Sequence, residues 1–268
     1  MTVRRALIPC GGKGTRMLAL TGGAPKELMP LAGAPMLTHV VRETAASGIT
    51  DLVIVIAPGK EAIVEQVAPL AGTRGMPERI SFLEQSEARG LADAIRLGRE
   101  FASGEALAVA LPDNLFLADR PALAQVIDRY EETKRNVVAI VEISAHEAAR
   151  RGATSIYAGS PRGDAFEIDF IPNKRDRAAR FDTGGASSAF SGVGRYVLDR
   201  HAFDAIDEVE RSLTPGTELD DVPVLQRLLA AAKLTGRLVR GRFLDLGLPE
   251  GFQEAEQALT VGEGRTVS

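Results

Sequence analysis

This sequence has a single cysteine, no long apolar run and no large excess of one charge. Cys10 is the single cysteine among 268 residues, so the chain can form no internal disulfide and fits a reducing compartment. No apolar stretch approaches the ~20 residues that span a bilayer, and Arg4 and Arg5 lead into a strand without the apolar core of a signal peptide. The net charge of −4 gives no support for nucleic acid or an anionic membrane as a partner. We therefore expect a soluble, cytoplasmic protein that binds neither nucleic acid nor membrane.

The composition is that of an ordinary globular protein, with 45% hydrophobic and 25% charged residues. The length is more typical of one domain with a smaller excursion than of two independent domains. We predict one domain over residues 1–260, made of two halves at 1–143 and 144–260. A disordered tail is expected at 261–268.

Strand and helix patterns alternate through the first half of the chain. Leu52 to Ala57 is a continuous apolar run, which indicates a strand buried on both faces, as in a parallel sheet. Further strands are predicted at 6–9, 79–83, 106–111 and 136–143, and helices at 36–47, 60–70, 90–101 and from 121 onward. In the second half, strands at 153–158 and 165–171 are expected around a turn at 160–163, then a mobile loop at 173–188, a strand at 190–198 and helices around 222–229 and 252–259. Repeated β-α-β units predict an α/β fold, a doubly wound sheet with helices on both faces.

The most informative stretch joins the first strand to a glycine-rich loop. The loop and the segment after it contain small and basic residues, namely Gly11, Gly12, Lys13, Gly14, Thr15, Arg16 and Lys26. Glycines at a strand end let backbone N–H groups approach a bound group without interference from Cβ. Such a concavity suits phosphate, and the basic side chains add positive charge. The pattern predicts a loop that holds a nucleoside triphosphate.

Two better-known glycine loops do not fit this spacing. A dinucleotide-binding G-x-G-x-x-G would need its third glycine where Met17 stands. A Walker A loop would need glycine at Leu7 and serine or threonine at Gly14. On these residues alone, an ordinary strand-to-helix turn with incidental charges remains an open alternative.

A longer string favours the nucleotide. G-G-K-G-T-R at 11–16, followed by P-K-E-L-M-P at 25–30, resembles the signature of the sugar-1-phosphate nucleotidyltransferases. The P-K-E form is most similar to the bacterial glucose-1-phosphate uridylyltransferases, or UDP-glucose pyrophosphorylases; the thymidylyltransferase branch usually carries Gln at the position of Glu27. The resemblance implies a Rossmann-like, mostly parallel sheet with a small β-rich excursion on the acceptor side. It also implies transfer of UMP from UTP, with dTTP as the alternative nucleotide, to a sugar 1-phosphate, and release of pyrophosphate. Arg16 would stabilise that pyrophosphate and Lys26 would steady the nucleotide phosphates.

Two aspartates are candidate metal ligands. Asp113 ends the run A-L-A-V-A-L-P-D, where ligands of open α/β sheets bind, although Asp is also common as a turn or cap residue after strands. The resemblance implies that Asp113, in L-P-D, and Asp245, in F-L-D-L-G, hold Mg²⁺. Two hard oxygen ligands and the triphosphate oxygens make a suitable site for that ion.

A second segment resembles the part of the family that reads the pyrimidine base. Gln85 is followed five residues later by Gly90 in G-L-A-D-A, and a Gln amide offers both a donor and an acceptor to an imide edge. The alternative is an unremarkable loop that opens an amphipathic helix. Glu27 is a candidate for the same role, or an acidic residue that satisfies a helix N-terminus.

The resemblance implies that 1–143 is the nucleotide-binding half and 144–260 the acceptor-binding half, and the acceptor side departs from the family pattern. Where relatives carry a sugar-binding Glu and a phosphate-neutralising Lys before a proline, this chain has Phe170 and Ile171 before Pro172. Lys174 is the candidate replacement for the missing charge, and Gly152 matches a position where the sugar passes close to the backbone. Glu218 matches a family carboxylate, although an N-capping cluster with the aspartates that follow it is the simpler account. Replacing hydroxyl-reading groups by Phe and Ile should weaken recognition of a plain hexose.

Two classes of function follow from this asymmetry. The preferred one is an Mg²⁺-dependent nucleotidyltransferase that acts on UTP and glucose 1-phosphate or a related phosphorylated sugar or polyol. The other is a non-catalytic nucleotide-sugar-binding regulatory protein on the same fold, because only the nucleotide half of the site is intact. A homo-oligomer is compatible with the family, and packing is the expected role of the three histidines.

Overall fold

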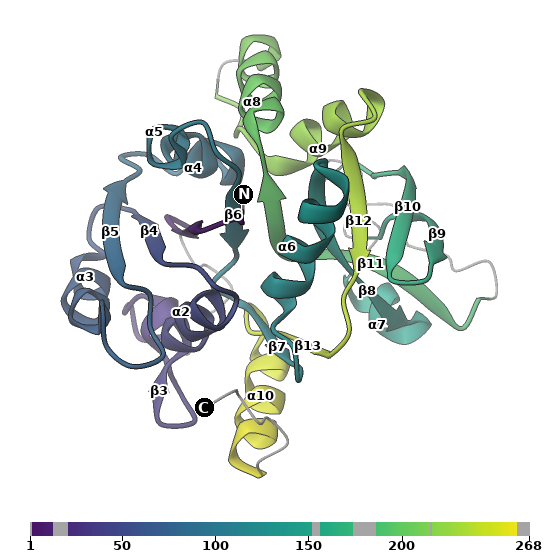
Figure 1. The fold of residues 1–268 in the computed structure, drawn as a ribbon. Helices are drawn as coiled ribbons and strands as arrows, with labels where there is room; N and C mark the ends of the chain where they lie inside the picture. Colours follow the sequence, from purple (N-terminus) through teal and green to yellow (C-terminus); the bar gives the residue numbers. More distant parts are fainter. Residues whose placement is uncertain (1, 13–20, 152–155, 174–185, 215, 262–268) are drawn as a thin grey trace.

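A nine-stranded mixed sheet forms the centre of the protein and runs from β5 at the left of Figure 1 to β9 at the right. The computed structural model describes residues 2–12, 21–151, 156–173, 186–214 and 216–261. The strand order is β5-β4-β1-β6-β11-β8-β12-β10-β9. Four of these strands form a parallel block in the first half of the chain: β1 (Arg5–Cys10), β4 (Asp51–Ile56), β5 (Arg79–Glu84) and β6 (Leu107–Ala110).

Helices cover both faces of this sheet, as the sequence predicted. Strand β1 shows why: Ala6 and Ile8 point into one hydrophobic core and Leu7 into the other, and none of the three is exposed. The first core receives helices α2 (Met36–Ala46), α3 (Glu61–Val67) and α6 (Ala122–Thr133). The second receives α4 (Leu91–Leu97), α5 (Arg99–Ala102), α8 (Arg200–Ser212) and α9 (Asp221–Ala230). The doubly wound α/β fold is confirmed.

The second half of the chain extends the sheet with strands of both directions. Strand β11 (Ser188–Leu198) is antiparallel to both of its neighbours, β6 and β8 (Asn136–Ser144), and β12 (Leu234–Leu238) is parallel to β8. The hairpin of β9 (Ala158–Arg162) and β10 (Ala165–Phe170) forms the far edge. Helix α7 (Ala145–Arg151) follows β8. The division of the chain at residue 143 stays a prediction.

A small satellite layer lies below the main sheet in Figure 1. Strand β7 (Asn114–Leu117) pairs antiparallel with β13 (Arg242–Asp245), and helix α10 (Pro249–Val261) packs beside them. A separate buried cluster that includes Leu115, Leu244 and Ala255 holds this layer together. The layer matters for the site because it brings the chain near residue 245 next to the chain near residue 113.

Some boundaries differ from the sequence prediction. The turn expected at 160–163 is wrong, because Arg162 pairs with Ala165 and the turn residues are Gly163 and Asp164. Gly163 has a φ of +65°, a conformation that suits glycine, and the preceding Pro161 lies on an edge strand, where a missing N–H is tolerated. The helix predicted at 90–101 is interrupted at Gly98, where a Cβ would lie 2.6 Å from Leu7 Cδ1. Residues 153–155, most of the 173–188 loop and the tail from 262 lie outside the described residues.

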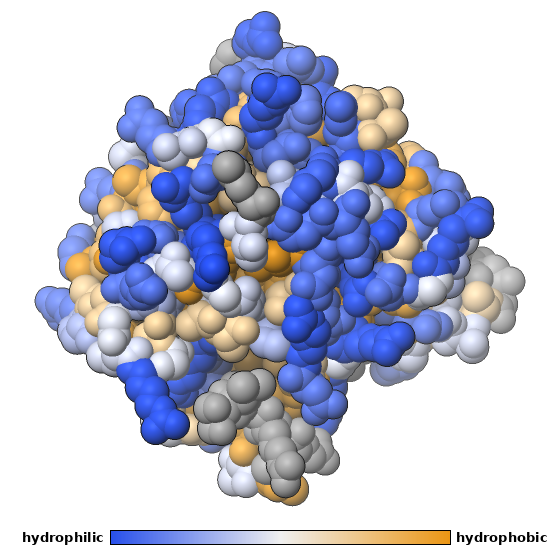
Figure 2. Space-filling view, viewed as in Figure 1, coloured by the Kyte–Doolittle hydropathy of each residue, from blue (hydrophilic) through white to orange (hydrophobic). Residues whose placement is uncertain are grey.

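Few large hydrophobic side chains are exposed on the described part of the surface. None of the helices that the structure describes is long and apolar enough to cross a bilayer. On the face shown in Figure 2, hydrophobic residues appear as scattered patches between hydrophilic ones. Among the described residues, the exposed large hydrophobic side chains are Phe170 and Val261.

Candidate functional site

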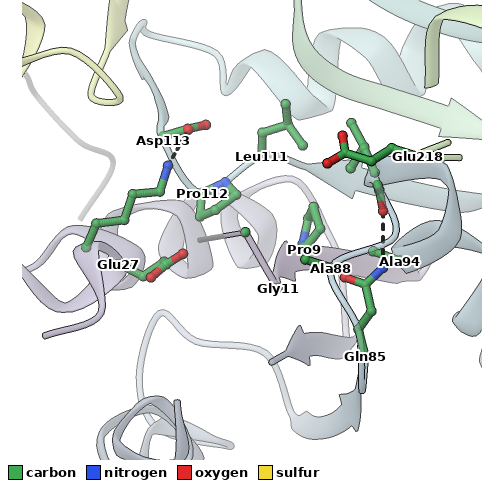
Figure 3. Close-up of a pocket in the computed structure, with 14 residues that line it drawn as sticks. Pro9, Gly11, Glu27, Gln85, Ala88, Ala94, Leu111, Pro112, Asp113 and Glu218 are labelled. Atoms are coloured by element: carbon green, nitrogen blue, oxygen red, sulfur yellow. Dashed lines mark hydrogen bonds and ion pairs between the residues drawn. The ribbon is translucent and has the colours of Figure 1, made fainter. Parts of the chain in front are cut away.

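A cavity of about 390 Å³ lies beyond the carboxyl ends of β1, β5 and β6 (Figure 3). The chain runs from β1 to β4 and β5 on one side and then returns to β6 on the other, so the cavity lies where the direction of winding reverses. Ligands of open α/β sheets bind at such a switch point. The cavity brings together most of the described residues that the sequence singled out: Gly11, Gly12, Lys26, Glu27, Gln85, Gly90, Asp113 and Glu218.

Lys60, which the sequence reasoning missed, holds the start of the glycine-rich loop. Its Nζ donates to the carbonyl oxygens of Cys10 at 2.7 Å and Gly12 at 2.8 Å, and to Glu27 Oε1 at 2.8 Å. One buried ammonium therefore ties the end of β1 to the segment that carries Lys26 and Glu27. Its position gave a hint of this role, because Lys60 comes shortly after β4, and the parallel strands β4 and β1 end at the same edge of the sheet. Residues Gly14, Thr15 and Arg16 lie outside the described residues, so their contacts with phosphate stay a prediction.

Glu27 lies in the wall of the cavity. Its side chain is 1% exposed, and its second oxygen, Oε2, is buried without a hydrogen-bond partner among the described residues. It belongs to the short 3-10 helix η2 (Lys26–Leu28), which begins directly after Pro25. The contact with Lys60 gives Glu27 a structural role, and its contact with a base stays a prediction.

At one end of the cavity, the charged end, Lys26 and Asp113 form an ion pair with 2.7 Å between Lys26 Nζ and Asp113 Oδ2. Burial disfavours the charged form of Lys26, but the nearby carboxylates, Asp113 above all and then Glu27, together outweigh this effect and raise the pKa of Lys26. Lys26 therefore keeps its positive charge at neutral pH.

Asp245 lies next to Asp113 because of the β7–β13 pairing, in which Asp245 faces Asn114. The Leu246 N–H donates to the Asp113 carbonyl at 2.8 Å, and the Gly247 N–H to Asp245 Oδ1 at 3.0 Å. A Cβ on Gly247 would lie 3.1 Å from Asp245 Oδ1 and 3.2 Å from Asp113 Oδ2. Two carboxylate oxygens thus border one small space that the glycine keeps open.

This arrangement fits a hard divalent cation. Carboxylate oxygens are the ligands that Mg²⁺ prefers, and Mg²⁺ is commonly bound by one or two carboxylates together with substrate phosphates. Within the described part of the chain, no three His, Cys, Asp or Glu side chains converge as a complete metal cage. Any cation bound between Asp113 and Asp245 would therefore depend on oxygens from the substrate or water.

Gln85, Gly11 and Gly90 form the opposite end of the cavity, the amide end. Gln85 follows β5 directly and is 5% exposed. A Cβ on Gly11 would lie 2.4 Å from Gln85 Oε1, so only glycine permits this approach. Gly90 has a φ of +110°, and a Cβ there would lie 2.4 Å from the carbonyl oxygen of Leu219. The structure thus explains both glycines by packing, and their contact with a base stays a prediction.

Arg195 lies behind the charged end of the cavity, and the sequence reasoning did not predict its role either. Its guanidinium is fully buried, contacts the carboxylate of Glu43 at 2.6 and 3.0 Å, and donates to the Asn114 carbonyl at 2.7 Å and the Leu111 carbonyl at 3.2 Å. Asn114 in turn donates from Nδ2 to Asp113 Oδ1 at 3.1 Å. These contacts fix the strand end that carries Asp113.

The acceptor side is only partly described. Ile171 is 1% exposed and belongs to the second hydrophobic core, whereas Phe170 is 58% exposed. Glu218 lines the cavity, and the N-capping role falls to Asp220, whose side chain accepts from the Asp221 N–H. Gly152 and Lys174 lie outside the described residues.

Cys10 is completely buried at the end of β1. Burial raises the pKa of its thiol well above the usual value. Cys10 is therefore a small packing residue rather than a reactive thiol.

Comparisons with known proteins agree with this geometry. Residues 5–261 match the family model described as nucleotidyl transferase. A Bacillus subtilis protein that carries the provisional name UTP–glucose-1-phosphate uridylyltransferase is 31% identical, over 93% of this chain and 94% of its own. A Staphylococcus epidermidis UTP–glucose-1-phosphate uridylyltransferase is 28% identical, over 93% of this chain and 90% of its own.

A solved structure of similar shape points the same way. A crystal structure of UDP-glucose pyrophosphorylase complexed with UDP-glucose superposes with a TM-score of 0.78 at 25% identity, over 97% of this chain and 99% of the other. The doubly wound sheet that the sequence indicated is the fold of this solved structure. The chain belongs to the nucleotidyl transferase family.

Proposed function

We propose that this protein is a UTP–glucose-1-phosphate uridylyltransferase, which converts UTP and glucose 1-phosphate into UDP-glucose and pyrophosphate. The observation that carries this proposal is one cavity that has Gln85, Gly11 and Gly90 at one end and the Lys26–Asp113 pair at the other. A nucleotide placed along it would have its base at the amide end and its phosphates at the charged end. The names of the relatives in Bacillus and Staphylococcus support the same substrates.

The reaction needs no nucleophile from the protein. An oxygen of the glucose 1-phosphate attacks the α-phosphorus of UTP and forms a new P–O bond. The bond from the α-phosphorus to the oxygen that bridges to the β-phosphorus breaks, and pyrophosphate leaves with that oxygen. Because a phosphate monoester is already a competent anion, catalysis consists of alignment and charge neutralisation.

The basic residues supply part of that neutralisation. Lys26 keeps a protonated ammonium at the charged end of the cavity and so brings positive charge to the nucleotide phosphates. Arg16, in the loop after Gly12, is assigned the departing pyrophosphate. Asp113 and Asp245 would hold Mg²⁺, which, when bound, neutralises the charge of phosphate oxygens.

The acceptor side is assigned from the sequence. Gly152 would lie against the sugar and Lys174 would neutralise its phosphate, and Glu218, which precedes α9, lines the cavity (Figure 3). UTP is preferred to dTTP because P-K-E carries Glu27. The cytoplasm as location and homo-oligomerisation belong to this proposal as well.

The test is pyrophosphate release with Mg²⁺, using the common nucleoside triphosphates against glucose 1-phosphate and a panel of phosphorylated sugars and polyols. We expect release with UTP and glucose 1-phosphate. Asp113→Ala and Asp245→Ala should each abolish turnover while the fold, followed by circular dichroism, stays largely intact. Asp128→Asn, in an exposed ion pair with Arg120, is the matched control and should keep full activity.

Three results would contradict the proposal, each at a different point. Release only with another acceptor would mean that the acceptor assignment is wrong, and would place the difference at Phe170 and Ile171. If no acceptor in the panel led to pyrophosphate release although UTP still bound, a non-catalytic nucleotide-sugar-binding protein would be favoured. Near-normal activity in either aspartate variant would refute the metal assignment.

A further inference from the structure

The side-chain amide of Gln85 is held in one orientation. Its Nε2 donates to Asp93 Oδ2 at 2.8 Å and to the Gly90 carbonyl at 3.2 Å. A carboxylate and a carbonyl have no hydrogen to give, so both amide hydrogens must point toward them. The opposite atom, Oε1, then faces Gly11 in the cavity wall. The amide therefore presents an acceptor, and not a donor, to the space beyond Gly11.

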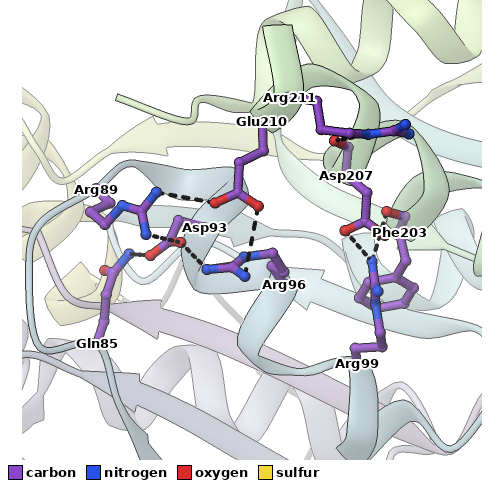
Figure 4. Close-up of polar contacts among 9 residues, drawn as sticks. All are labelled: Gln85, Arg89, Asp93, Arg96, Arg99, Phe203, Asp207, Glu210 and Arg211. Atoms are coloured by element: carbon purple, nitrogen blue, oxygen red, sulfur yellow. Dashed lines mark hydrogen bonds and ion pairs between the residues drawn. The ribbon is translucent and has the colours of Figure 1, made fainter. Parts of the chain in front are cut away.

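Asp93 is itself held from several sides. Its side chain is 5% exposed on α4, and Arg96 Nη2 lies 2.7 Å from its Oδ1. Arg89 Nη1 lies 3.9 Å from the same oxygen, and both arginines reach Glu210 on α8, at 3.1 and 3.8 Å (Figure 4). Paired with two guanidinium groups, the Asp93 carboxylate has the electrostatic partners that a buried charge requires. It thus accepts from Gln85 as well as from Arg96.

The orientation decides which pyrimidine fits. Uracil and thymine carry an N–H donor at position 3, between two carbonyl groups, whereas cytosine carries an acceptor at that position. An acceptor at Gln85 Oε1 matches the imide N–H and opposes the cytosine lone pair. If the amide turned over, its NH₂ group would match cytosine instead. A Gln alone can offer either group, so some other residue must select the orientation.

We propose that Asp93 is a positioning residue that fixes Gln85 with Oε1 toward the base, so that the site selects nucleotides whose pyrimidine carries an N3–H. This inference rests on the proposed function in one respect, namely that the base lies against Gln85. It goes beyond that function because Asp93 contacts no substrate and sets specificity through another side chain.

The decisive variant is Asp93→Asn, which keeps the shape of the side chain. The oxygen of the introduced amide can still accept from Arg96, but its NH₂ group then faces Gln85. Neither orientation of the Gln85 amide can then satisfy both that NH₂ group and the Gly90 carbonyl. The matched control is Asp207→Asn, in the Arg99–Asp207 pair of 2.7 Å between α5 and α8, which does not reach Gln85 (Figure 4).

The measurement is equilibrium binding of UTP and of CTP, with no acceptor present, followed by thermal unfolding of each variant. We expect the wild type to prefer UTP, and Asp93→Asn to lower the UTP-to-CTP affinity ratio by a factor of about 10 to 100, the range for a misplaced hydrogen bond. Asp207→Asn should leave the ratio unchanged. If Asp93→Asn does not fold, Asp93→Ala, which removes the acceptor without adding a donor, is measured in the same way.

A double variant tests whether Asp93 acts through Gln85. In the background of Gln85→Leu, Asp93→Asn should no longer change the UTP-to-CTP ratio. An unchanged ratio in the single variant, or an equal loss for both nucleotides, would overturn the proposal, and so would a wild type without preference. A wild type that prefers UTP in binding but releases no pyrophosphate would refute the proposed function and leave this inference standing.

Discussion

Replacing Arg195 by methionine tests how strongly the protein depends on one buried ion pair. Methionine keeps most of the length of the side chain and removes the guanidinium. In the native structure that group is fully buried, lies 5.1 Å from the ring centre of Phe116 and pairs with Glu43, whose side chain is 11% exposed. The variant leaves the Glu43 carboxylate with a hydrogen bond from the Leu123 N–H at 3.0 Å as its remaining described contact.

The expected cost follows from these contacts. Removing one partner of a buried ion pair costs about 3–5 kcal/mol, because the other charge stays buried without compensation. The Asn114 carbonyl also loses a donor at 2.7 Å, although part of that loss is already included in the same range. For a chain of this size, each kcal/mol lowers Tm by about 2–4 °C, so a decrease of roughly 6–20 °C is expected.

The assay is equilibrium unfolding in urea, with Tm by circular dichroism as the second readout. Arg120→Gln is the control, because its pair with Asp128 is exposed, with 59% and 43% of the two side chains accessible, and should cost less than about 1 kcal/mol. The double variant Arg195→Met/Glu43→Met should be less destabilised than the sum of the two single variants. A loss below about 1 kcal/mol for Arg195→Met, or strict additivity in the double variant, would refute the reasoning.

The remaining predictions concern the glycine loop, the carboxylate pair and a buried histidine. Lys60→Met removes the donor to the loop carbonyls and to Glu27, and should raise the KM for UTP about 10-fold or more in steady-state kinetics; an unchanged KM would contradict it. Gly247→Ala places a methyl group between the two carboxylates and should raise the Mg²⁺ concentration for half-maximal activity, with Tm nearly unchanged. Burial lowers the pKa of His39 below 6.5, although its hydrogen bond to the Leu31 carbonyl opposes this, so the unfolded chain takes up the proton first. Stability from this residue is complete above pH 6.5 and is lost as pH falls, so wild type should lose more unfolding free energy than His39→Gln between about pH 7.5 and 5.

Much of the first half was predictable because local pattern and burial agree there. The runs that form β1 and β4 are buried on both faces, and their strand-end residues meet at one edge because parallel strands all end on the same side. This geometry brings Gln85 and Asp113, 28 residues apart in the sequence, to one cavity, as the family resemblance implied.

The missed residues are those whose partners are distant in the sequence. Arg195 lies within strand β11, where a charged residue suggests only an interruption of an apolar run, and its partner Glu43 is 152 residues away. In the sequence, Lys60 has the pattern of a surface charge that follows a strand. Its contacts with the carbonyl oxygens of Cys10 and Gly12 become apparent only in the structure. Helix α8 was also missed, although its signals are local. Asp199 caps it, and Phe203 and Ile206 follow at helical spacing.

The altered acceptor segment has a physical explanation in strand β10. The pairing of β10 with β9 shifts between Ile168 and Phe170, so the regular alternation of the strand is broken at that point. Phe170 consequently faces solvent while Ile171 packs in the core, and the Ile171 carbonyl accepts from Gln226 Nε2 at 2.8 Å. A charged side chain at 171 would have to be buried among apolar groups, which costs several kcal/mol unless it is paired. The charge that neutralises the acceptor phosphate must therefore come from outside this strand, and Lys174, in the segment predicted as a loop at 173–188, is the proposed source, which the substrate panel tests.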